Sequence, residues 1–318
     1  MVDVARNFHS KDAILATLDQ MAAYKMNKLH LHLTDDEGWR LEIPSLPELT
    51  DIGAKRCHDL TETRCVLPQL GSGPTGDGYV NGFYSVADYT EILQAAIARQ
   101  IEVIPSLDMP GHARAAIKSM EARHDRLLRE GQAAAATAHL LSDPNDTSKY
   151  SSIQYYSDNT INPCRESSFA FIETVLDDVI AIHAAAGQPL KRYHIGADET
   201  AGAWTESPIC EAFFKDNKYG VTEREELTGY FIERVTNIIA DRGVIPGGWN
   251  DGLDETNPDN LPAQVQSNLW GVLPWGGTSA VHKHANRGWD AVLSTPDVLY
   301  FDFPYEVHPQ EGGYYWAS

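Results

Sequence analysis

Two adjacent carboxylates, Asp198 and Glu199, follow an apolar run that predicts a buried strand, within RYHIGADETAGAW (residues 192–204). Neighbouring side chains on a strand point to opposite faces, but where the strand passes into a loop both can turn toward one cavity. The plainer interpretation is an acidic loop whose Asp caps the next helix. Residue types elsewhere in the chain must therefore distinguish a cap from a catalytic pair.

Aromatic residues close to other acids favour the catalytic alternative. Four of them follow at or near later strand ends: Trp249, Trp270, Tyr300 and Trp316. Each alone would be ordinary core packing, because an indole ring buries a large apolar area. Several beside acids at one rim predict a sugar pocket, where indole faces stack on a pyranose ring. Cleavage of a glycosidic bond needs an acid to protonate the leaving oxygen and negative charge to stabilise the oxocarbenium-like centre.

Histidines raise the alternative of a metal site, at His30, His32, His112 and His194. Histidine and carboxylate together suit zinc or iron, but the sequence holds no HExxH motif. His30 and His32 share one face of a predicted strand, where hydrogen-bonded core histidines are more common. The segments SLDMPG and LSTPD lack the GxSxG pattern of a nucleophile elbow. We therefore expect neither a bound metal nor another cofactor.

The chain around these residues alternates between strand-like runs and helical patterns. Strands are predicted in VDVARNF, KLHLHLTDD, IEVIPSLDMPGH, YHIGADE, VIPGGWND, AQVQSNLWG and AVLSTPDVLY. Helices are predicted at 10–27, 86–100, 168–186, 223–242 and 278–287. Such alternation implies parallel strands with right-handed crossovers, which fits a doubly wound sheet or a (β/α)8 barrel.

The positions of polar residues distinguish these two folds. Predicted strand ends that precede helices carry Arg6, Asp35, Asp108, His112, Asp198, Glu199, Trp249, Asp251, Trp270 and Tyr300. In a barrel those ends share the face where active sites lie, whereas a doubly wound sheet concentrates ligand contacts at its switch point. We therefore predict an α/β fold of the (β/α)8 TIM-barrel type as one catalytic domain over residues 1–318. A long polar insertion is expected at about 113–165, and the eighth strand is expected beyond Ser318.

Composition and charge narrow the class of ligand. The 318 residues are 42% hydrophobic and 22% charged, as in an ordinary soluble globular protein. A formal net charge of −20 argues against nucleic-acid or anionic-membrane partners and favours a neutral or cationic ligand. No apolar run approaches the roughly 20 residues that span a bilayer. The start, MVDVARNFHSKDAIL, lacks a signal-peptide pattern and enters a core strand at once, so we expect an excised fragment.

Six segments, in order along nearly the whole chain, resemble glycoside hydrolase family 20, the β-N-acetylhexosaminidases, and especially its bacterial chitobiases. They are DVARNF, HLHLTDDEGWR, DMPGHARA, HIGADE, GGWND and SNLWG. The patterns H-x-G-A-D-E and D-x-P-G-H are highly specific. The resemblance implies a catalytic (β/α)8 barrel, normally preceded by separate β-rich domains. It also implies an eighth strand with a tryptophan and a glutamate of the sugar site, which this chain stops too soon to contain.

The resemblance further implies substrate-assisted catalysis. The substrate's own 2-acetamido oxygen attacks the anomeric carbon and forms an oxazolinium ion, with net retention of configuration. Asp198 matches the residue that orients the acetamido N–H and stabilises its positive charge. Glu199 matches the general acid, which later activates water. The adjacency of the two acids would thus serve two atoms of one substrate.

Other positions match supporting residues of the family. Asp35 and His112 match the relay behind Glu199, and Asp108 matches a carboxylate that supports Asp198. The substrate-binding positions are Arg6 and Asp302 for sugar hydroxyls, Trp249, Trp270 and Tyr300 around the acetamido group, and Trp316 as the platform for the next sugar.

The leading hypothesis is therefore an exo-acting β-N-acetylhexosaminidase that releases terminal GlcNAc from chitobiose and chito-oligosaccharides. One alternative is a barrel kept as a non-catalytic carbohydrate-binding module, and another is a metal-dependent barrel hydrolase. Intact Asp198 and Glu199 favour the enzyme, since a lectin does not need a general acid.

The four cysteines, Cys57, Cys65, Cys164 and Cys210, include no CxxC pair, so a zinc ribbon is not expected. A cytosolic enzyme would keep them as free buried thiols. The resemblance points instead to an exported bacterial protein, periplasmic or at the cell surface, where disulfides persist. Among three possible connectivities we predict Cys57–Cys65 and Cys164–Cys210, because each links nearby loop ends.

Overall fold

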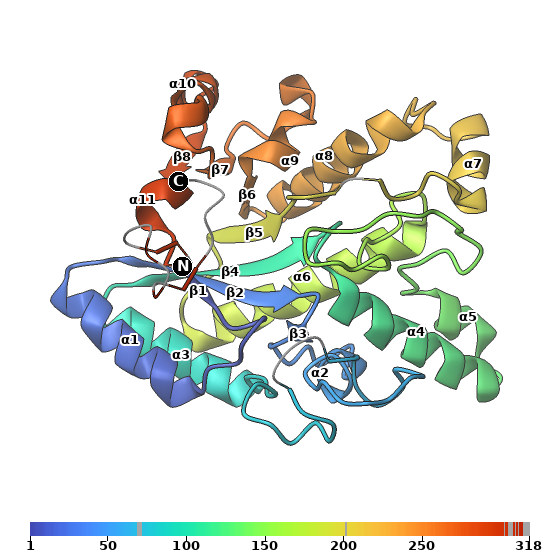
Figure 1. The fold of residues 1–318 in the computed structure, drawn as a ribbon, viewed down its shortest axis with the longest axis horizontal. Helices are drawn as coiled ribbons and strands as arrows, with labels where there is room; N and C mark the ends of the chain where they lie inside the picture. Colours follow the sequence, from blue (N-terminus) through green and yellow to red (C-terminus); the bar gives the residue numbers. More distant parts are fainter. Residues whose placement is uncertain are drawn as a thin grey trace.

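A sheet of parallel strands forms the centre of the protein (Figure 1). The computed structural model describes residues 1–68, 72–200, 202–301, 303–304, 308, 310 and 312–313. Its parallel strands are β1 (Val2–Asp3), β2 (Lys28–Asp35), β4 (Glu102–Met109), β5 (Arg192–Gly196), β6 (Ile245–Trp249), β7 (Gln266–Leu269) and β8 (Asp290–Leu293). A short β3 (Gly38–Trp39) runs antiparallel to β2.

The strand order confirms the predicted barrel type. Each parallel strand pairs with the one before it in the chain, and the order never reverses as it would in a doubly wound sheet. The strands β1 and β8 form the two edges, so the barrel is incomplete within the described residues.

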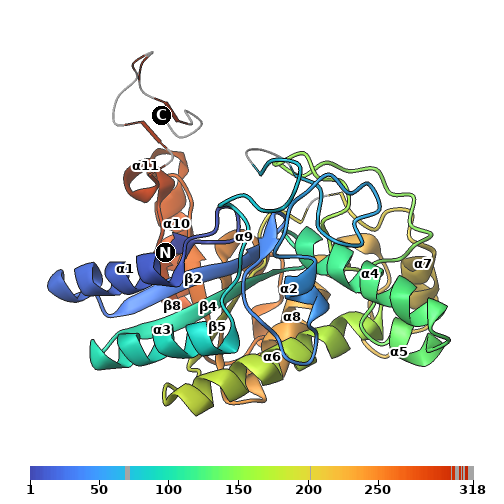
Figure 2. The same cartoon turned by 90° about the horizontal axis from the view of Figure 1, so that it is seen from below.

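Helices connect the strands and cover the outer side of the sheet. The α-helices are α1 (Lys11–Ala23), α2 (Glu48–Asp51), α3 (Val86–Ala98), α4 (Arg114–Arg129), α5 (Ala133–Thr137), α6 (Glu166–Ala186), α7 (Pro208–Lys215), α8 (Leu227–Ala240), α9 (Asn250–Asp254), α10 (Gly277–Asn286) and α11 (Pro296–Leu299). Three 3₁₀ helices are η1 (Arg224–Glu226), η2 (Pro258–Asn260) and η3 (Leu273–Trp275). The helices α1, α3 and α6 lie side by side along one side of the sheet (Figure 2). In the part of the chain that the structure describes, no helix has the length and apolar character needed to cross a membrane.

Local signals in the sequence explain the helix boundaries. Ser10 accepts a hydrogen bond from the backbone N–H of Ala13, as an N-cap residue does. Ser85 and Asp88 form a capping box at the start of α3. The helix α6 ends at Gly187, whose φ of 84° lies in the left-handed region that glycine adopts without strain. The five predicted helices are all present, with small differences at their ends.

Strand β2 shows how the fold separates core from site. Leu29, Leu31 and Leu33 belong to the hydrophobic core, and His30 and His32 alternate with them. Because side chains alternate along a strand, both histidines point to the opposite face, the barrel interior. They are buried there, as expected for core histidines.

Both predicted disulfides are present. The Cα atoms of Cys57 and Cys65 lie 5.7 Å apart, and those of Cys164 and Cys210 lie 5.2 Å apart. Cys164 precedes α6, and Cys210 lies in α7, which follows the loop that carries the Asp198–Glu199 pair. The second bridge therefore ties the segment before α6 to the far end of that loop.

The segment predicted as an insertion contacts the sheet at two places. Its helix α4 packs against β2 and β3, with Ala115, Ile117 and Met120 buried. Farther along, Asn159 donates a hydrogen bond of 2.9 Å to the carboxylate of Asp36. The segment thus reaches the end of β2, where the candidate site begins.

Candidate active site

The carboxyl ends of the strands bring the predicted polar residues to one face of the sheet. Arg6 follows β1, Asp35 ends β2, and His112 follows β4. Asp198 and Glu199 follow β5 directly after Gly196 and Ala197. Because all of these strands are parallel, residues from distant parts of the sequence meet at this face.

A chain of polar contacts leads from Arg6 to Glu199. The Arg6 Nη2 lies 2.8 Å from Asp35 Oδ2, and His112 Nδ1 lies 3.2 Å from Asp35 Oδ1. On its other side, His112 Nε2 lies 3.3 Å from Glu199 Oε2 and 3.6 Å from Asp198 Oδ2. The predicted relay residues are therefore brought together, and one imidazole nitrogen faces both acids of the pair.

His112 is an imidazolium in this arrangement, because both of its ring nitrogens face carboxylate oxygens. Burial alone would lower the pKa of His112, but the Asp35 carboxylate, through its charge and its hydrogen bond, raises it well above its usual value. The Asp35 carboxylate stays ionised: burial opposes its charge, but Arg6 and His112 hold the pKa of Asp35 well below its usual range.

The two acids of the pair differ in protonation. Burial raises the pKa of Asp198 to about 8, and the carboxylates of Asp108 and Asp251 add to that increase. Burial would also raise the pKa of Glu199, but the hydrogen bond and positive charge of His112 lower it overall. At neutral pH the pair therefore holds one proton, which lies on Asp198 when no substrate is bound.

Asp108 is a buried carboxylate whose charge raises the pKa of Asp198. Its carboxylate accepts a hydrogen bond of 3.1 Å from the Ser106 hydroxyl. The close approach of Asp108 requires glycine at position 196, because a Cβ there would collide with the Asp108 carboxylate, and the φ of Gly196 is 68°. Gly196 thus lets the carboxylate of β4 reach the loop that follows β5.

Left-handed backbone conformations surround the pair. Ala197, Glu199 and His112 have φ values of 73°, 54° and 52°. Such conformations cost roughly 1–3 kcal/mol each for residues other than glycine and concentrate at functional sites. They turn the Asp198 and Glu199 side chains, which would alternate on a strand, toward the same imidazole.

Asp251 connects the pair to a tryptophan, a role that sequence reasoning did not assign. Its Oδ2 accepts a hydrogen bond of 3.2 Å from the Glu199 backbone N–H. Its Oδ1 accepts one of 2.7 Å from Trp270 Nε1. The only signal in the sequence was that Asp251 follows a strand end. Trp270, predicted as a wall of the acetamido pocket, is thus joined through Asp251 to the loop that carries Asp198 and Glu199.

Trp249 lies at the end of β6 with only 8% of its surface exposed. Its ring centroid lies 5.4 Å from that of His194 and 6.3 Å from that of His30. The ring therefore rests on the two interior histidines, at the bottom of the face that carries the acids.

The expected position of Tyr300 at a strand end is wrong. The strand β8 ends at Leu293, and the short helix α11 separates it from Tyr300, whose ring centroid lies 6.3 Å from that of Phe303. Pro296 explains the difference, because proline in the first turn of a helix has a backbone φ suited to it and lacks an N–H that would stay unpaired there. The predicted substrate residues Asp302 and Trp316 lie outside the described residues.

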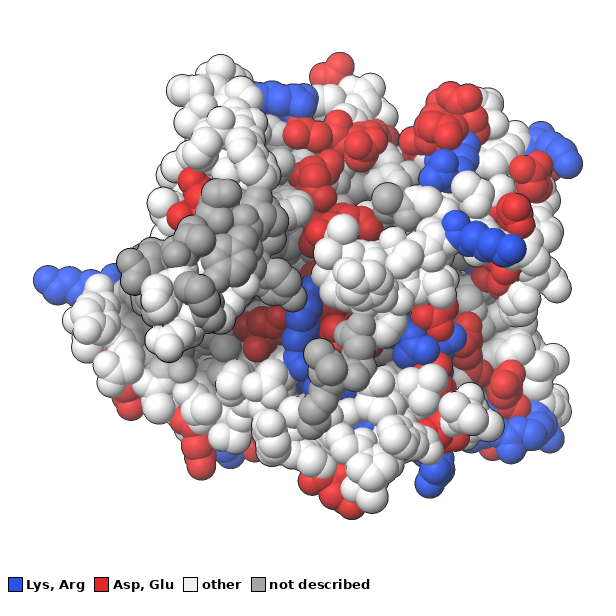
Figure 3. Space-filling view, in the orientation of Figure 1, with Lys and Arg blue, Asp and Glu red and all other residues white. Residues whose placement is uncertain are grey.

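An open cavity of about 330 Å³ lies beside Glu199. Its walls include Trp204, Arg224, Glu225, Asp251 and Glu255. Acidic side chains gather over this part of the face, around α9, in Figure 3. The cavity gives a polar ligand access to the loop that carries Glu199, with hydrogen-bonding groups on several sides.

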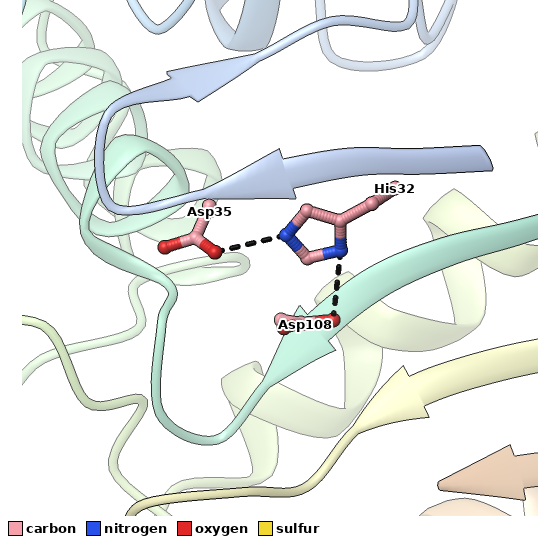
Figure 4. A group of neighbouring side chains, drawn as sticks. All are labelled: His32, Asp35 and Asp108. Carbon is pink, nitrogen blue, oxygen red and sulfur yellow. Dashed lines mark hydrogen bonds and ion pairs between the residues drawn. The ribbon is translucent and has the colours of Figure 1, made fainter. Parts of the chain in front are cut away.

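Among the described residues, two groups of side chains have the composition of a metal site: His32, Asp35 and Asp108, and Asp35, Asp36 and His112 (Figure 4 shows the first). In both groups the nitrogen and oxygen atoms already face one another, at 2.9 Å for His32 Nε2 and Asp35 Oδ2. A metal ligand must be deprotonated, yet the surrounding carboxylates raise the pKa of His32, against burial, to about 9. The geometry and charges thus favour a proton network at these positions.

Comparison with known sequences supports the predicted family. Residues 1–318 match the model of the glycosyl hydrolase family 20 catalytic domain. Over 100% of its length the chain is 53% identical to a β-hexosaminidase of Vibrio vulnificus and 51% identical to an N,N'-diacetylchitobiase of Vibrio harveyi. The alignments cover 38% and 40% of those two proteins, so the chain spans about two fifths of their length.

Solved structures with the same fold come from the same family. A GH20 exo-β-N-acetylglucosaminidase from Vibrio harveyi, in complex with N-acetylglucosamine, is similar with a TM-score of 0.80 and 35% identity, over 99% of this chain and 43% of that one. A GH20 β-N-acetylhexosaminidase from Streptomyces coelicolor A3(2) has a TM-score of 0.65 and 27% identity, over 99% of this chain and 51% of that one. Because the catalytic-domain model matches the chain from its first residue to its last, this chain belongs to glycoside hydrolase family 20.

Proposed function

We propose that the complete protein is a retaining exo-β-N-acetylhexosaminidase that releases terminal β-linked GlcNAc from chitobiose and chito-oligosaccharides. The observation that carries the proposal is the adjacent pair Asp198 and Glu199, whose two carboxyl groups face one nitrogen of His112. The names of the relatives, β-hexosaminidase and N,N'-diacetylchitobiase, support the substrate class.

In the first step the 2-acetamido oxygen of the substrate attacks C1, and the bond from C1 to the leaving sugar breaks. Glu199 gives its proton to the leaving oxygen as this bond breaks. Positive charge develops on the acetamido nitrogen, and the Asp198 carboxylate accepts the hydrogen bond from its N–H. In the second step water attacks C1 and passes a proton to Glu199, while the bond between C1 and the acetamido oxygen breaks.

These roles place the shared proton on Glu199, whereas the unliganded site holds it on Asp198. Substrate binding provides the reason for the transfer. The acetamido N–H stabilises an ionised Asp198, and the leaving sugar removes water from around Glu199, which raises the pKa of that carboxyl. The pair carries one proton both in the free site and with substrate bound. Substrate binding therefore moves this proton from Asp198 to Glu199 and does not change the number of protons on the enzyme.

The pH dependence of kcat/KM should therefore follow the pair. We expect the rate to fall above about pH 8, where the single proton is lost, since the pKa of Asp198 is about 8. On the acid side, we expect kcat/KM to fall only below pH 4.5, the usual pKa of glutamate, because His112 lowers the pKa of Glu199. The measurement is a pH profile on an aryl β-GlcNAc glycoside, with circular dichroism at each pH to confirm folding. An upper limb at pH 6 would contradict this assignment.

Replacement of Asp198 by Asn should reduce kcat by at least ~10²-fold, a typical loss when one preorganised electrostatic contact to the transition state is removed. The asparagine side chain would resemble the protonated acid in shape but could not ionise when the acetamido nitrogen gains charge. The measurement is kcat on chitobiose, and Asp241→Asn, at an exposed position at the end of α8, is the matched control. Unchanged kcat in D198N would remove Asp198 from the mechanism.

The experiment that tests the function as a whole is the incubation of the complete protein with chitobiose, followed by proton NMR. The proposal expects GlcNAc as the product, formed first as the β anomer, in the presence of a chelator. Binding of chitobiose without turnover would instead indicate a carbohydrate-binding barrel. Loss of turnover with the chelator, restored by a divalent metal, would indicate a metal-dependent hydrolase.

We also propose that the complete protein is exported to the periplasm or the cell surface. The two disulfides support this location, because such bonds persist in oxidising compartments.

A further inference from the structure

His32 lies between the two halves of the catalytic network. Its Nε2 lies 2.9 Å from Asp35 Oδ2, and Asp35 supports the His112–Glu199 relay. Its Nδ1 lies 3.6 Å from Asp108 Oδ1, and Asp108 lies behind Asp198 (Figure 4). The side chain is 2% exposed, so it does not touch substrate.

The contacts of His32 fit a ring with hydrogens on both nitrogens. Asp35 is ionised and can only accept, so Nε2 must donate. On the other side, Nδ1 also lies 3.4 Å from the Ser106 hydroxyl oxygen. That hydroxyl donates its hydrogen to Asp108 Oδ1 at 3.1 Å, which leaves an oxygen lone pair toward His32. Both nitrogens thus face acceptors, and the ring is an imidazolium.

We propose that His32 is a positioning residue. Its positive charge links Asp35, on the Glu199 side of the site, to Asp108, on the Asp198 side, and keeps Asp108 ionised. This inference rests on the function proposed above for Asp198 and Glu199. Burial opposes the charge on His32, but the carboxylates of Asp108, Asp3 and Asp35 outweigh it, and they raise the pKa of the ring to about 9.

The charged and titratable groups around His32 come from several strands. They are Asp3 on β1 and Arg6 after it, His30 and Asp35 on β2, Asp108 on β4 and His194 on β5. His30 and His194 are neutral, because burial holds their pKa values below the usual range. With Arg6 and His112, the ring is therefore one of the cations that compensate the carboxylates of Asp3, Asp35 and Asp108.

Loss of the His32 charge should act on Asp198 through Asp108. Burial already raises the pKa of Asp108, and His32 opposes that increase. Without the imidazolium, Asp108 takes up a proton. A neutral Asp108 no longer raises the pKa of Asp198, so the upper limb of the pH profile moves to lower pH. The acid limb stays in place, because Glu199 is held by His112, which Asp35 and Arg6 still support.

The test is the pH profile of kcat/KM for His32→Gln, Asp108→Asn and the double variant of the complete protein. We expect each single variant to lower the upper limb by about one pH unit, the smaller end of the shift caused by a neighbouring charge. The double variant should show no further shift, since both changes act on one path. The matched control is His183→Gln, which removes another buried histidine, one that contacts Tyr89 and Gln188 on the outer side of the sheet. Neither limb of the pH profile of H183Q should move.

A second measurement does not depend on activity. In a side-chain nitrogen NMR spectrum of the ¹⁵N-histidine-labelled protein, the signal missing from H32Q belongs to His32. If H32Q does not fold, the signal displaced by D108N gives the assignment. We expect an imidazolium at pH 8. A neutral ring there, or an active H32Q enzyme with unshifted limbs, would overturn the proposal. A wild-type protein without hexosaminidase activity would instead defeat the proposed function, while the NMR result still tests the charge of His32.

Discussion

Replacement of Glu199 by Gln should reduce the turnover of chitobiose by ~10³-fold or more, within the range that a positioned general acid contributes. The leaving group of chitobiose is a sugar hydroxyl, which leaves poorly without a proton. A Gln side chain can still place an oxygen against His112 Nε2, which lies 3.3 Å from Glu199 Oε2, so the loop should keep its conformation. The variant thus removes the proton and little else.

The same variant should lose less on an aryl β-GlcNAc glycoside with an acidic phenol, because that leaving group departs without protonation. The comparison of the two substrates therefore isolates the acid role. Glu206→Gln, an exposed position farther along the same loop, is the control and should be as active as the wild type. Equal losses of E199Q on both substrates would show that Glu199 is not the acid.

Much of this site could be predicted from sequence because local patterns encode it. The alternation of leucine and histidine from Leu29 to Leu33 predicted a strand with one polar face, and the structure places His30 and His32 there. Acids at the ends of parallel strands must share one face, so Asp35, Asp108 and Asp198 were expected together. Pro296 shows the limit of such reasoning, because the short helix it begins separates Tyr300 from its strand.

Contacts between strands could not be predicted in this way. Asp251 contacts Glu199, and Trp270 contacts Asp251, only because β5, β6 and β7 are adjacent in the sheet. The different protonation of Asp198 and Glu199 is also invisible in sequence. It arises from the burial of Asp198 and from the hydrogen bond that His112 gives to Glu199, and both depend on the folded loop.

Removal of the 2-acetamido group from the substrate should nearly abolish hydrolysis. An aryl β-glucoside should react at least ~10⁴-fold more slowly than the matching β-GlcNAc glycoside, because a well-placed intramolecular nucleophile is worth about 7–11 kcal/mol. The enzyme offers no replacement at the pair. Asp198 holds the proton in the free site, and a protonated acid is a poor nucleophile.

A graded series of substrates separates this chemistry from a simple loss of binding. Fluorine atoms on the acetamido methyl group withdraw electrons from the attacking oxygen but keep the shape and the N–H of the group. If the substrate supplies the nucleophile, kcat should fall steadily from the acetyl to the trifluoroacetyl glycoside, with KM changing much less. If the acetamido group served only for recognition, kcat would be the same across the series. In that case a carboxylate of the enzyme would be the nucleophile, and a two-carboxylate mechanism would replace the one proposed for Asp198 and Glu199.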